Sequence, residues 1–194
     1  MTAFVLGNGI SRSLVDVNAL LKLGPVYGCN ALYRTHTPTV LVATDAPIAK
    51  KIQESGYALT NRFYTRRPMP KLGANPLTKK YFGFSSGPNA VALAAIDKNI
   101  EIYLLGFDLG PTQSGTFNNM YASTEFYKTA NSEPTHAGNW VKQIISIAQE
   151  FRQCVFTRVH GETTANVPEF DKVPNINKMD LVDFVQRINK PKDL

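Results

Sequence analysis

The feature that most constrains the fold is a helix-like segment followed directly by a strand-like segment in the middle of the chain. Residues 85–96 read SSGPNAVALAAI, which is typical of a polar helix start and of a small-residue helix that can lie close on a sheet. Residues 100–108 read IEIYLLGFD, which predicts a buried strand ending at Gly106 and Asp108. In open α/β sheets, ligands bind outside the carboxyl ends of the strands. This order places a helix N-terminus and a strand-end carboxylate where a phosphorylated ligand would bind.

Strand-like and helix-like segments alternate along the rest of the chain. The predicted strands are residues 3–6, 26–29, 40–44, 100–105 and 154–158, with a weaker one at 62–65. The predicted helices are residues 13–23, 46–55, 88–99, 140–151 and 179–189. Because the strands are apolar on both faces, we expect an α/β fold, a mostly parallel sheet with helices on both faces.

Length and composition bound the organisation of the chain. A chain of 194 residues, 43% of them hydrophobic, can bury one core and is short for two, so we expect a single domain over residues 1–194. The N-terminal apolar run is too brief for a signal peptide, and no segment could span a bilayer. Cys29 and Cys154 stand in or beside strand-like runs, which favours buried thiols in a reducing compartment over a disulfide. These features predict a cytoplasmic protein.

The charge balance favours anionic partners. Lysine and arginine outnumber the acidic residues by 21 to 15, which gives a formal net charge of +6. Nucleotides, phosphosugars and nucleic acids all fit this balance. The clustered basic residues are Arg62, Arg66, Arg67, Lys71, Lys79 and Lys80. A solvated basic loop and an anion-binding site both remain open for this cluster, and RNA binding is the least favoured alternative.

Residues 109–135 interrupt the alternation. This segment is rich in Gly, Pro, Ser, Thr and Asn, but it also carries Phe117, Tyr121, Phe126 and Tyr127. Long connections in compact domains are commonly lids or binding loops, and aromatic side chains give such a loop a surface that can fold onto a ligand. We therefore expect a lid near residues 109–135, with a surface loop as the alternative.

A turn with two glycines follows the first strand. Gly7 and Gly9 would let backbone amides approach a ligand closely, and Asn8 offers a donor and an acceptor to a ribose or a phosphate. A tight turn also uses Asn and Gly for purely conformational reasons. Arg12 stands in place of the third glycine of the dinucleotide-binding fingerprint, and no acidic residue stands where the ribose partner of that motif is expected. The sequence therefore argues against an NAD site.

Further polar residues follow the next strands and begin the central helix. Asn30 follows the second strand, and Asp45 follows the third, where it can also cap a helix that has Pro47 in its first turn. Because the carboxyl ends of parallel strands meet at one edge of the sheet, we expect these side chains to converge on a common crevice. The converging set is Asn8, Asn30, Asp45, Ser86 and Asp108.

The lid segment leads into a histidine. His136 precedes a predicted helix, and it could serve there as a general base because its unperturbed pKa lies near neutrality; a capping or packing role is the alternative. Three scattered histidines and two distant cysteines give no metal-ligand spacing, so no metal is expected. The chain also lacks the phosphate-binding loop of ATP-hydrolysing enzymes.

Taken in chain order, these motifs resemble those of a known enzyme family. The matching residues are Gly7, Asn8, Gly9, Ser11, Cys29, Asn30, Ser86, Gly87, Gly106, Phe107, Asp108 and His136. The pattern is similar to that of the bacterial sialyltransferases that build sialylated lipooligosaccharides from CMP-sialic acid. That resemblance covers most of residues 1–151 and implies a Rossmann-like domain, a flexible lid and no metal or cofactor. A similar architecture is expected for uncharacterised bacteriophage proteins.

The resemblance also implies roles for individual residues. Asn8, Asn30 and Ser86 would hold the nucleotide together with Gly106 and Asp108, and the neighbouring Gly7, Gly9, Asp45 and Gly87 complete the implied nucleotide site. His136 would deprotonate an acceptor hydroxyl, and Tyr121 would hydrogen-bond the departing phosphate. The implied function is a sialyltransferase-like enzyme that uses a nucleotide-activated sugar.

Two other functions remain open. The alternatives are a nucleotide-binding or sequestering protein without catalysis and a hydrolase of a nucleotide derivative. The expected partner in each case is a small nucleotide or nucleotide sugar. The quaternary structure stays open, with a homo-oligomer among the alternatives.

Overall fold

The computed structural model describes residues 1–189, and in that range it forms one sheet of eight strands, each parallel to its neighbours. The strands are β1 (Thr2–Leu6), β2 (Val26–Cys29), β3 (Val40–Ala43), β4 (Phe63–Thr65), β5 (Asn75–Pro76), β6 (Glu101–Leu105), β7 (Val155–His160) and β8 (Ile176–Asp180). The expected α/β, Rossmann-like fold is confirmed.

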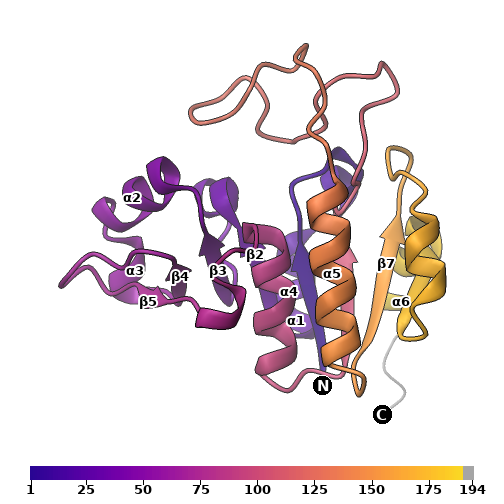
Figure 1. The fold of residues 1–194 in the computed structure, drawn as a ribbon, viewed down its shortest axis with the longest axis horizontal. Helices are drawn as coiled ribbons and strands as arrows, with labels where there is room; N and C mark the ends of the chain where they lie inside the picture. The colour runs from indigo at the N-terminus through magenta and orange to yellow at the C-terminus, as the bar shows by residue number, and fades with distance from the viewer. Residues whose placement is uncertain (190–194) are drawn as a thin grey trace.

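The order of the strands creates a switch point next to β1. Across the sheet they follow the order β5-β4-β3-β2-β1-β6-β7-β8. The first half of the chain therefore builds the sheet outward from β1 on one side, and the second half begins with β6 on the other side (Figure 1). In doubly wound sheets, the crevice for ligands lies at the carboxyl ends of the strands where the order reverses. In this protein that crevice is predicted between the ends of β1 and β6.

Helices cover both faces of the sheet because alternate strand residues face opposite sides. In β1, Ala3 and Val5 belong to one core, and Phe4 and Leu6 belong to the other. The helices α4 (Ser86–Ile96) and α5 (Gly138–Glu150) pack into the first core. The helices α1 (Val17–Leu23), α2 (Ala46–Glu54), α3 (Tyr57–Thr60) and α6 (Leu181–Asn189) pack into the second. Short 3-10 helices are η1 (Ile10–Leu14), η2 (Asn30–Arg34), η3 (Lys79–Tyr81) and η4 (Pro168–Lys172).

The central helix α4 is buried on nearly every side. Nine of its eleven residues are buried, and its alanines let it lie close on β1, β2 and β3 while α5 packs beside it. Asn89 fixes the loop before the helix, because its side-chain amide donates to the carbonyl oxygens of Tyr81, Phe84 and Ser85. The N-terminus of α4 is thereby held at the carboxyl edge of the sheet.

Residues 109–137 form no helix or strand and cross above the carboxyl ends of the strands (Figure 1). Hydrogen bonds to the backbone of the loop after β1 hold this segment in place. The Asn118 side chain accepts from Ile10 N–H at 2.9 Å, and Met120 N–H donates to the Asn8 carbonyl at 2.8 Å. The Tyr127 hydroxyl accepts from Ala31 N–H at 3.3 Å. We call residues 109–135 the lid segment, because it crosses the carboxyl edge of the sheet in the part of the chain where the sequence predicted a lid.

The sequence prediction was wrong at several element boundaries. The predicted helix 13–23 is interrupted, because Asp16 caps α1 by accepting from the backbone N–H of Asn18 at 2.9 Å, and the preceding residues form η1. The predicted helix 179–189 begins two residues later, since Met179 and Asp180 complete β8. The strands β5 and β8 were not predicted.

Candidate functional site

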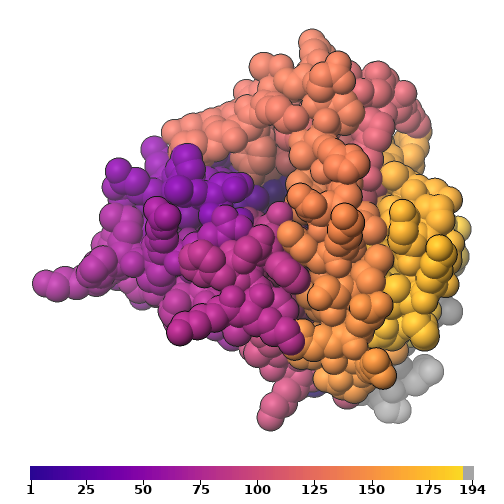
Figure 2. All heavy atoms as spheres, viewed as in Figure 1, coloured from indigo at the N-terminus to yellow at the C-terminus, as the bar shows by residue number. Residues whose placement is uncertain are grey.

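A cavity of about 270 Å³ opens at the carboxyl ends of β1, β2, β3 and β6, beneath the lid segment. Figure 2 shows this hollow between the N-terminal part of the chain and α5. We call it the switch-point cavity. All nine residues of the predicted nucleotide site line it, namely Gly7, Asn8, Gly9, Asn30, Asp45, Ser86, Gly87, Gly106 and Asp108. The structure therefore brings together residues that lie up to 101 positions apart in the chain.

The glycines of the cavity allow the two strand-end loops to touch each other. A side chain on Gly7 would place its Cβ 2.5 Å from the Gly106 carbonyl oxygen, and one on Gly9 would place it 2.7 Å from the same atom. Gly106 itself has a φ of +69°, in the left-handed region that favours glycine. The glycine pattern is therefore explained by the contact between the loops after β1 and β6, whatever ligand the cavity holds.

The Asp108 carboxylate is saturated by donors within the protein. It is 3% exposed and accepts from the Ser11 backbone N–H at 3.0 Å, from the Ser11 hydroxyl, from Asn118 Nδ2 at 3.0 Å, and from the hydroxyls of Thr163 at 2.7 Å and Thr164 at 3.3 Å. These donors come from the loop after β1, the lid segment and the loop after β7. Asp108 thus joins three loops around the cavity.

Two buried arginines hold the strand ends, and the sequence reasoning assigned neither of them a role. Arg158 is 1% exposed and donates to the carbonyl oxygens of Phe107 and Asp108, each at 2.9 Å. Burial lowers the pKa of Arg158 to about 10, so its guanidinium stays charged at neutral pH. Arg12 is 3% exposed, donates to the Gly7 carbonyl, and donates to Asn8 Oδ1 at 3.2 Å. Arg12 therefore fixes the orientation of the Asn8 amide.

A chain of hydrogen bonds orients Asn30. The Ser86 hydroxyl accepts from the Thr44 backbone N–H at 3.0 Å and donates to Asn30 Oδ1 at 2.9 Å. The hydroxyls of Thr44 and Ser86 are also 2.9 Å apart. Asn30 has a φ of +52°, in the left-handed region that asparagine tolerates better than most residues. Because Oδ1 is occupied by Ser86, the Nδ2 of Asn30 is the group left to donate to a ligand.

Asp45 occupies the N-cap position of α2 without capping it. Its backbone is extended, and no cap bond to its side chain occurs among residues 1–189. The capping alternative for Asp45 is therefore not what the structure shows, although Pro47 does lie in the first turn as predicted. The side chain is exposed and lines the cavity. Asp45 is thus an accessible carboxylate at the edge of the site.

The two residues that were assigned catalytic roles do not line the cavity. His136 is exposed, and its ring lies over the start of α5, where Nε2 would be 2.6 Å from a Cβ on Gly138. Tyr121 is half-buried, its hydroxyl lies 3.5 Å from an Arg12 nitrogen, and its ring packs on that of Tyr127. Thr135, which directly precedes His136, does line the cavity. The catalytic roles stay predictions.

Aromatic residues that the sequence did not assign to the site complete its walls. Phe117 from the lid segment and Trp140 from α5 line the cavity, as does Phe107 after β6. The Trp140 indole N–H donates to the Ser85 hydroxyl at 3.0 Å, which fixes the ring at the N-terminus of α4. The aromatic content of the lid segment gave a signal for Phe117, but nothing in the sequence placed Trp140 there.

Cys29 also lines the cavity, but its thiol is unreactive at neutral pH. Both Cys29 and Cys154 are buried free thiols that form no disulfide within residues 1–189, as the sequence predicted. Burial raises the pKa of Cys29 to about 12, so its thiol is protonated at neutral pH. Cys29 therefore contributes apolar wall.

Comparisons of the chain with protein-family models, curated proteins and solved structures found no match. The resemblance to sialyltransferases therefore stays a prediction. Within residues 1–189, no helix is long and apolar enough to cross a membrane. In the same range, no three His, Cys, Asp or Glu side chains are grouped so that they could hold a metal ion.

Proposed function

We propose that the switch-point cavity binds the nucleotide part of a nucleotide-activated sugar. The observation that carries this proposal is the N-terminus of α4, which opens into the cavity through Ser86 and Gly87. Pro88 has no N–H, and Asn89 N–H donates to the Ser85 carbonyl at 3.0 Å. The first N–H groups of a helix have no acceptor within the helix, so those of Ser86 and Gly87 are available to a phosphate.

The side chains around this helix end suit the rest of a nucleotide. Ser86 holds Asn30 through Oδ1, which leaves Nδ2 to donate to phosphate or ribose oxygens. Asn8 is held by Arg12 through Oδ1 and donates one N–H of Nδ2 to the Cys29 carbonyl at 3.4 Å, which leaves its second N–H for a ligand. Phe117 and Trp140 offer aromatic faces on which a base can stack. The cavity volume of about 270 Å³ is slightly below the usual range for small-ligand pockets, which begins at about 300 Å³.

Thermal unfolding in the presence of candidate ligands tests this proposal. A ligand that binds the native state raises the midpoint of thermal unfolding. We would therefore add, at about 1 mM each, CMP, CDP, UMP, AMP, NAD and the corresponding nucleotide sugars. We expect a selective response to one nucleotide class, with Asn30→Ala weakening that ligand about tenfold. Asn18→Ala, an exposed amide on α1, should leave the affinity unchanged. A screen in which no nucleotide shifts the midpoint would overturn the proposal.

A second proposed function is transfer of the sugar to an acceptor. It is favoured by Thr135, which lines the cavity and directly precedes His136 in the chain. The sialyltransferase resemblance makes CMP-sialic acid the first donor to assay. His136→Ala should abolish turnover and leave nucleotide affinity within about twofold of wild type. Unchanged turnover in that variant would exclude His136 as the base, and tight binding without conversion of the ligand would favour a protein that only binds nucleotides.

A further inference from the structure

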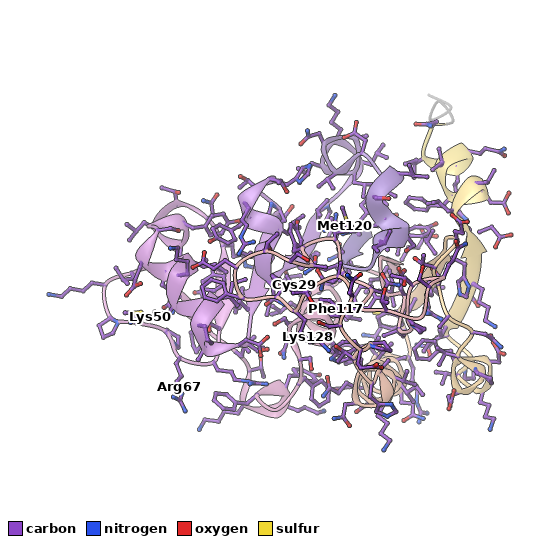
Figure 3. The ribbon with its side chains drawn as sticks, turned by 90° about the horizontal axis from the view of Figure 1, so that it is seen from above. Cys29, Lys50, Arg67, Phe117, Met120 and Lys128 are labelled. Atoms are coloured by element: carbon purple, nitrogen blue, oxygen red, sulfur yellow. The ribbon has the colours of Figure 1, made fainter. Side chains whose placement is uncertain are left out.

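A second and larger cavity lies beside the switch-point cavity. Its volume is about 810 Å³, and it opens beyond the carboxyl ends of β3 and β4. The two cavities share Thr44 and Asp45, so a molecule in one lies next to a molecule in the other. Seen from above, Lys50 and Arg67 mark this side of the molecule, away from Cys29 and Phe117 of the first cavity (Figure 3).

The charged residues of this second cavity are mostly cations. Lys50, Arg66 and Arg67 line it, and Asp45 is the acidic residue in its lining. Lys50 forms an ion pair with Glu54 at 3.7 Å, which leaves Arg66 and Arg67 against Asp45, a formal balance of +1. We call this space the basic cavity. A balance of this kind attracts anions, and low-dielectric walls strengthen the attraction.

The structure separates these residues from the rest of the basic cluster seen in the sequence. Arg62 forms an ion pair with Asp97 at 2.7 Å, and Lys80 forms one with Glu150 at 2.6 Å. These cations are neutralised where they stand. The basic track that an RNA strand would follow is therefore interrupted by acidic partners, and Arg66 and Arg67 are the members of the cluster that line the basic cavity.

Arg66 is fixed in place before any ligand arrives. Its Nε donates to the Phe82 carbonyl at 2.7 Å and its Nη2 donates to the Phe84 carbonyl at 3.0 Å. Its guanidinium also lies 6.0 Å from the centre of the Phe82 ring. Two of its five N–H groups are used in this way, and Nη1 has no bond among residues 1–189. An arginine held by carbonyl groups is preorganised to donate its remaining N–H groups to an anion.

The loop that carries Arg67 is fixed as well. Gln53 of α2 is 2% exposed, and its side chain donates to the Arg67 carbonyl at 3.4 Å and accepts from Met69 N–H at 2.7 Å. The Arg67 guanidinium has no hydrogen bond or ion pair within the described chain, residues 1–189. A buried amide thus holds the backbone, while the charged group stays available to a ligand.

The remaining walls are suited to a carbon skeleton. Ala46, Pro47, Ala49 and Met69 line the basic cavity, and Phe82 is 46% exposed there, which is high for a phenylalanine. An exposed aromatic face can pack against the carbon skeleton of a ligand, and arginine binds carboxylate and phosphate groups by charge-assisted hydrogen bonds. The combination of apolar wall and fixed arginines favours a small organic anion over a bare inorganic ion.

We infer that the basic cavity binds a second substrate, a sugar that carries a phosphate or carboxylate group, with that group on Arg66 and Arg67 and the ring against Phe82. This inference rests on the proposed function, because it makes the molecule in the basic cavity the acceptor that meets a nucleotide sugar across Thr44 and Asp45. It adds to that function the chemical class of the acceptor, an acidic sugar.

Isothermal titration with three probes tests the inference. Glucose 6-phosphate, glucuronate and uncharged glucose are titrated into the full chain at low salt, in the presence of a saturating concentration of the nucleotide that gives the largest thermal shift in the screen. We expect binding of at least one acidic sugar and none of glucose. Arg67→Gln should weaken that binding about tenfold, and Arg152→Gln, an exposed arginine at the far end of α5, should leave it unchanged. Binding of only one acidic probe identifies the group as phosphate or carboxylate.

The outcomes separate this inference from the proposed function. If a nucleotide binds but neither acidic sugar does, or if Arg67→Gln binds the acidic sugar as tightly as wild type, the inference is overturned and the nucleotide proposal stands. If no nucleotide binds, the proposed function is overturned and the acceptor role falls with it. Nucleotide affinity in Arg67→Gln should stay within about twofold of wild type, because Arg67 does not line the switch-point cavity and acts on it only through its electric field.

Discussion

Asp108 provides the sharpest test of how the site is built, because the structure and the sequence give it different tasks. The sequence assigned it to the nucleotide, whereas the structure surrounds it with donors from three loops. Oδ2 alone accepts three bonds, from Ser11 N–H, Asn118 and Thr163. Bonds to a charged acceptor are worth about 1 kcal/mol more than bonds to a neutral one. Asp108→Asn keeps the shape but removes the charge, so we expect a loss of about 3 kcal/mol.

Urea unfolding followed by circular dichroism measures this loss. With a slope of about 2 kcal/mol/M, the midpoint should fall by about 1.5 M while the slope stays unchanged. Asp183→Asn, an exposed acid on α6, should cost under about 1 kcal/mol. If Asp108→Asn is no less stable than Asp183→Asn but loses its nucleotide response, Asp108 is a ligand-binding group and the structural reasoning is wrong.

Three further predictions follow from the geometry of the cavities. Gly9→Ala should lower the unfolding temperature by several degrees, because its Cβ would lie 2.7 Å from the Gly106 carbonyl oxygen, while Gly83→Ala, which meets no atom within 4 Å, should not. Cys29 should resist a thiol reagent in the native protein at pH 8 and react after unfolding, because with a pKa of about 12 only about one thiol in ten thousand is ionised; equal native and unfolded rates would contradict this. Asp45→Asn should strengthen nucleotide binding about fivefold, because it removes a carboxylate that repels a nearby phosphate by about 1 kcal/mol. Calorimetry measures this affinity, and weaker binding would show that the carboxylate contacts the ligand.

The fold was predictable to the extent that strands were apolar on both faces. The strands β1, β2, β3 and β6 lie inside the sheet, and their sequences are mostly apolar. The edge strand β8 was missed because Asn177, Lys178 and Asp180 face solvent and its sequence resembles a polar loop. The other edge strand, β5, has two residues, one of them Pro76, which no strand pattern would identify.

The location of the site was more predictable than the contacts within it. Asn8, Asn30 and Asp108 converge because every parallel strand delivers its next residue to the same edge, which is a consequence of topology alone. The direction of each side chain depends on partners that are distant in sequence. Thr163 is 55 positions from Asp108, and no local pattern shows that its hydroxyl turns the carboxylate inward. The burial of Arg12 was likewise hidden, because its acceptors are carbonyl and amide oxygens without charge.

The electrostatics of the two cavities explain how an acidic residue can border a phosphate site. The Asp108 carboxylate is buried and turned toward its own donors, so Asp45 is the exposed carboxylate that a nucleotide phosphate would meet. Asp45 also lines the basic cavity, where Arg66 and Arg67 offset its charge. Asp45 repels a phosphate at the N-terminus of α4, and the neighbouring cations reduce this repulsion. The positive end of the helix dipole attracts the phosphate and so acts against the same repulsion. If this balance holds, neutralising Arg67 weakens anion binding in the basic cavity strongly and in the switch-point cavity only slightly, since the N–H groups of α4 remain.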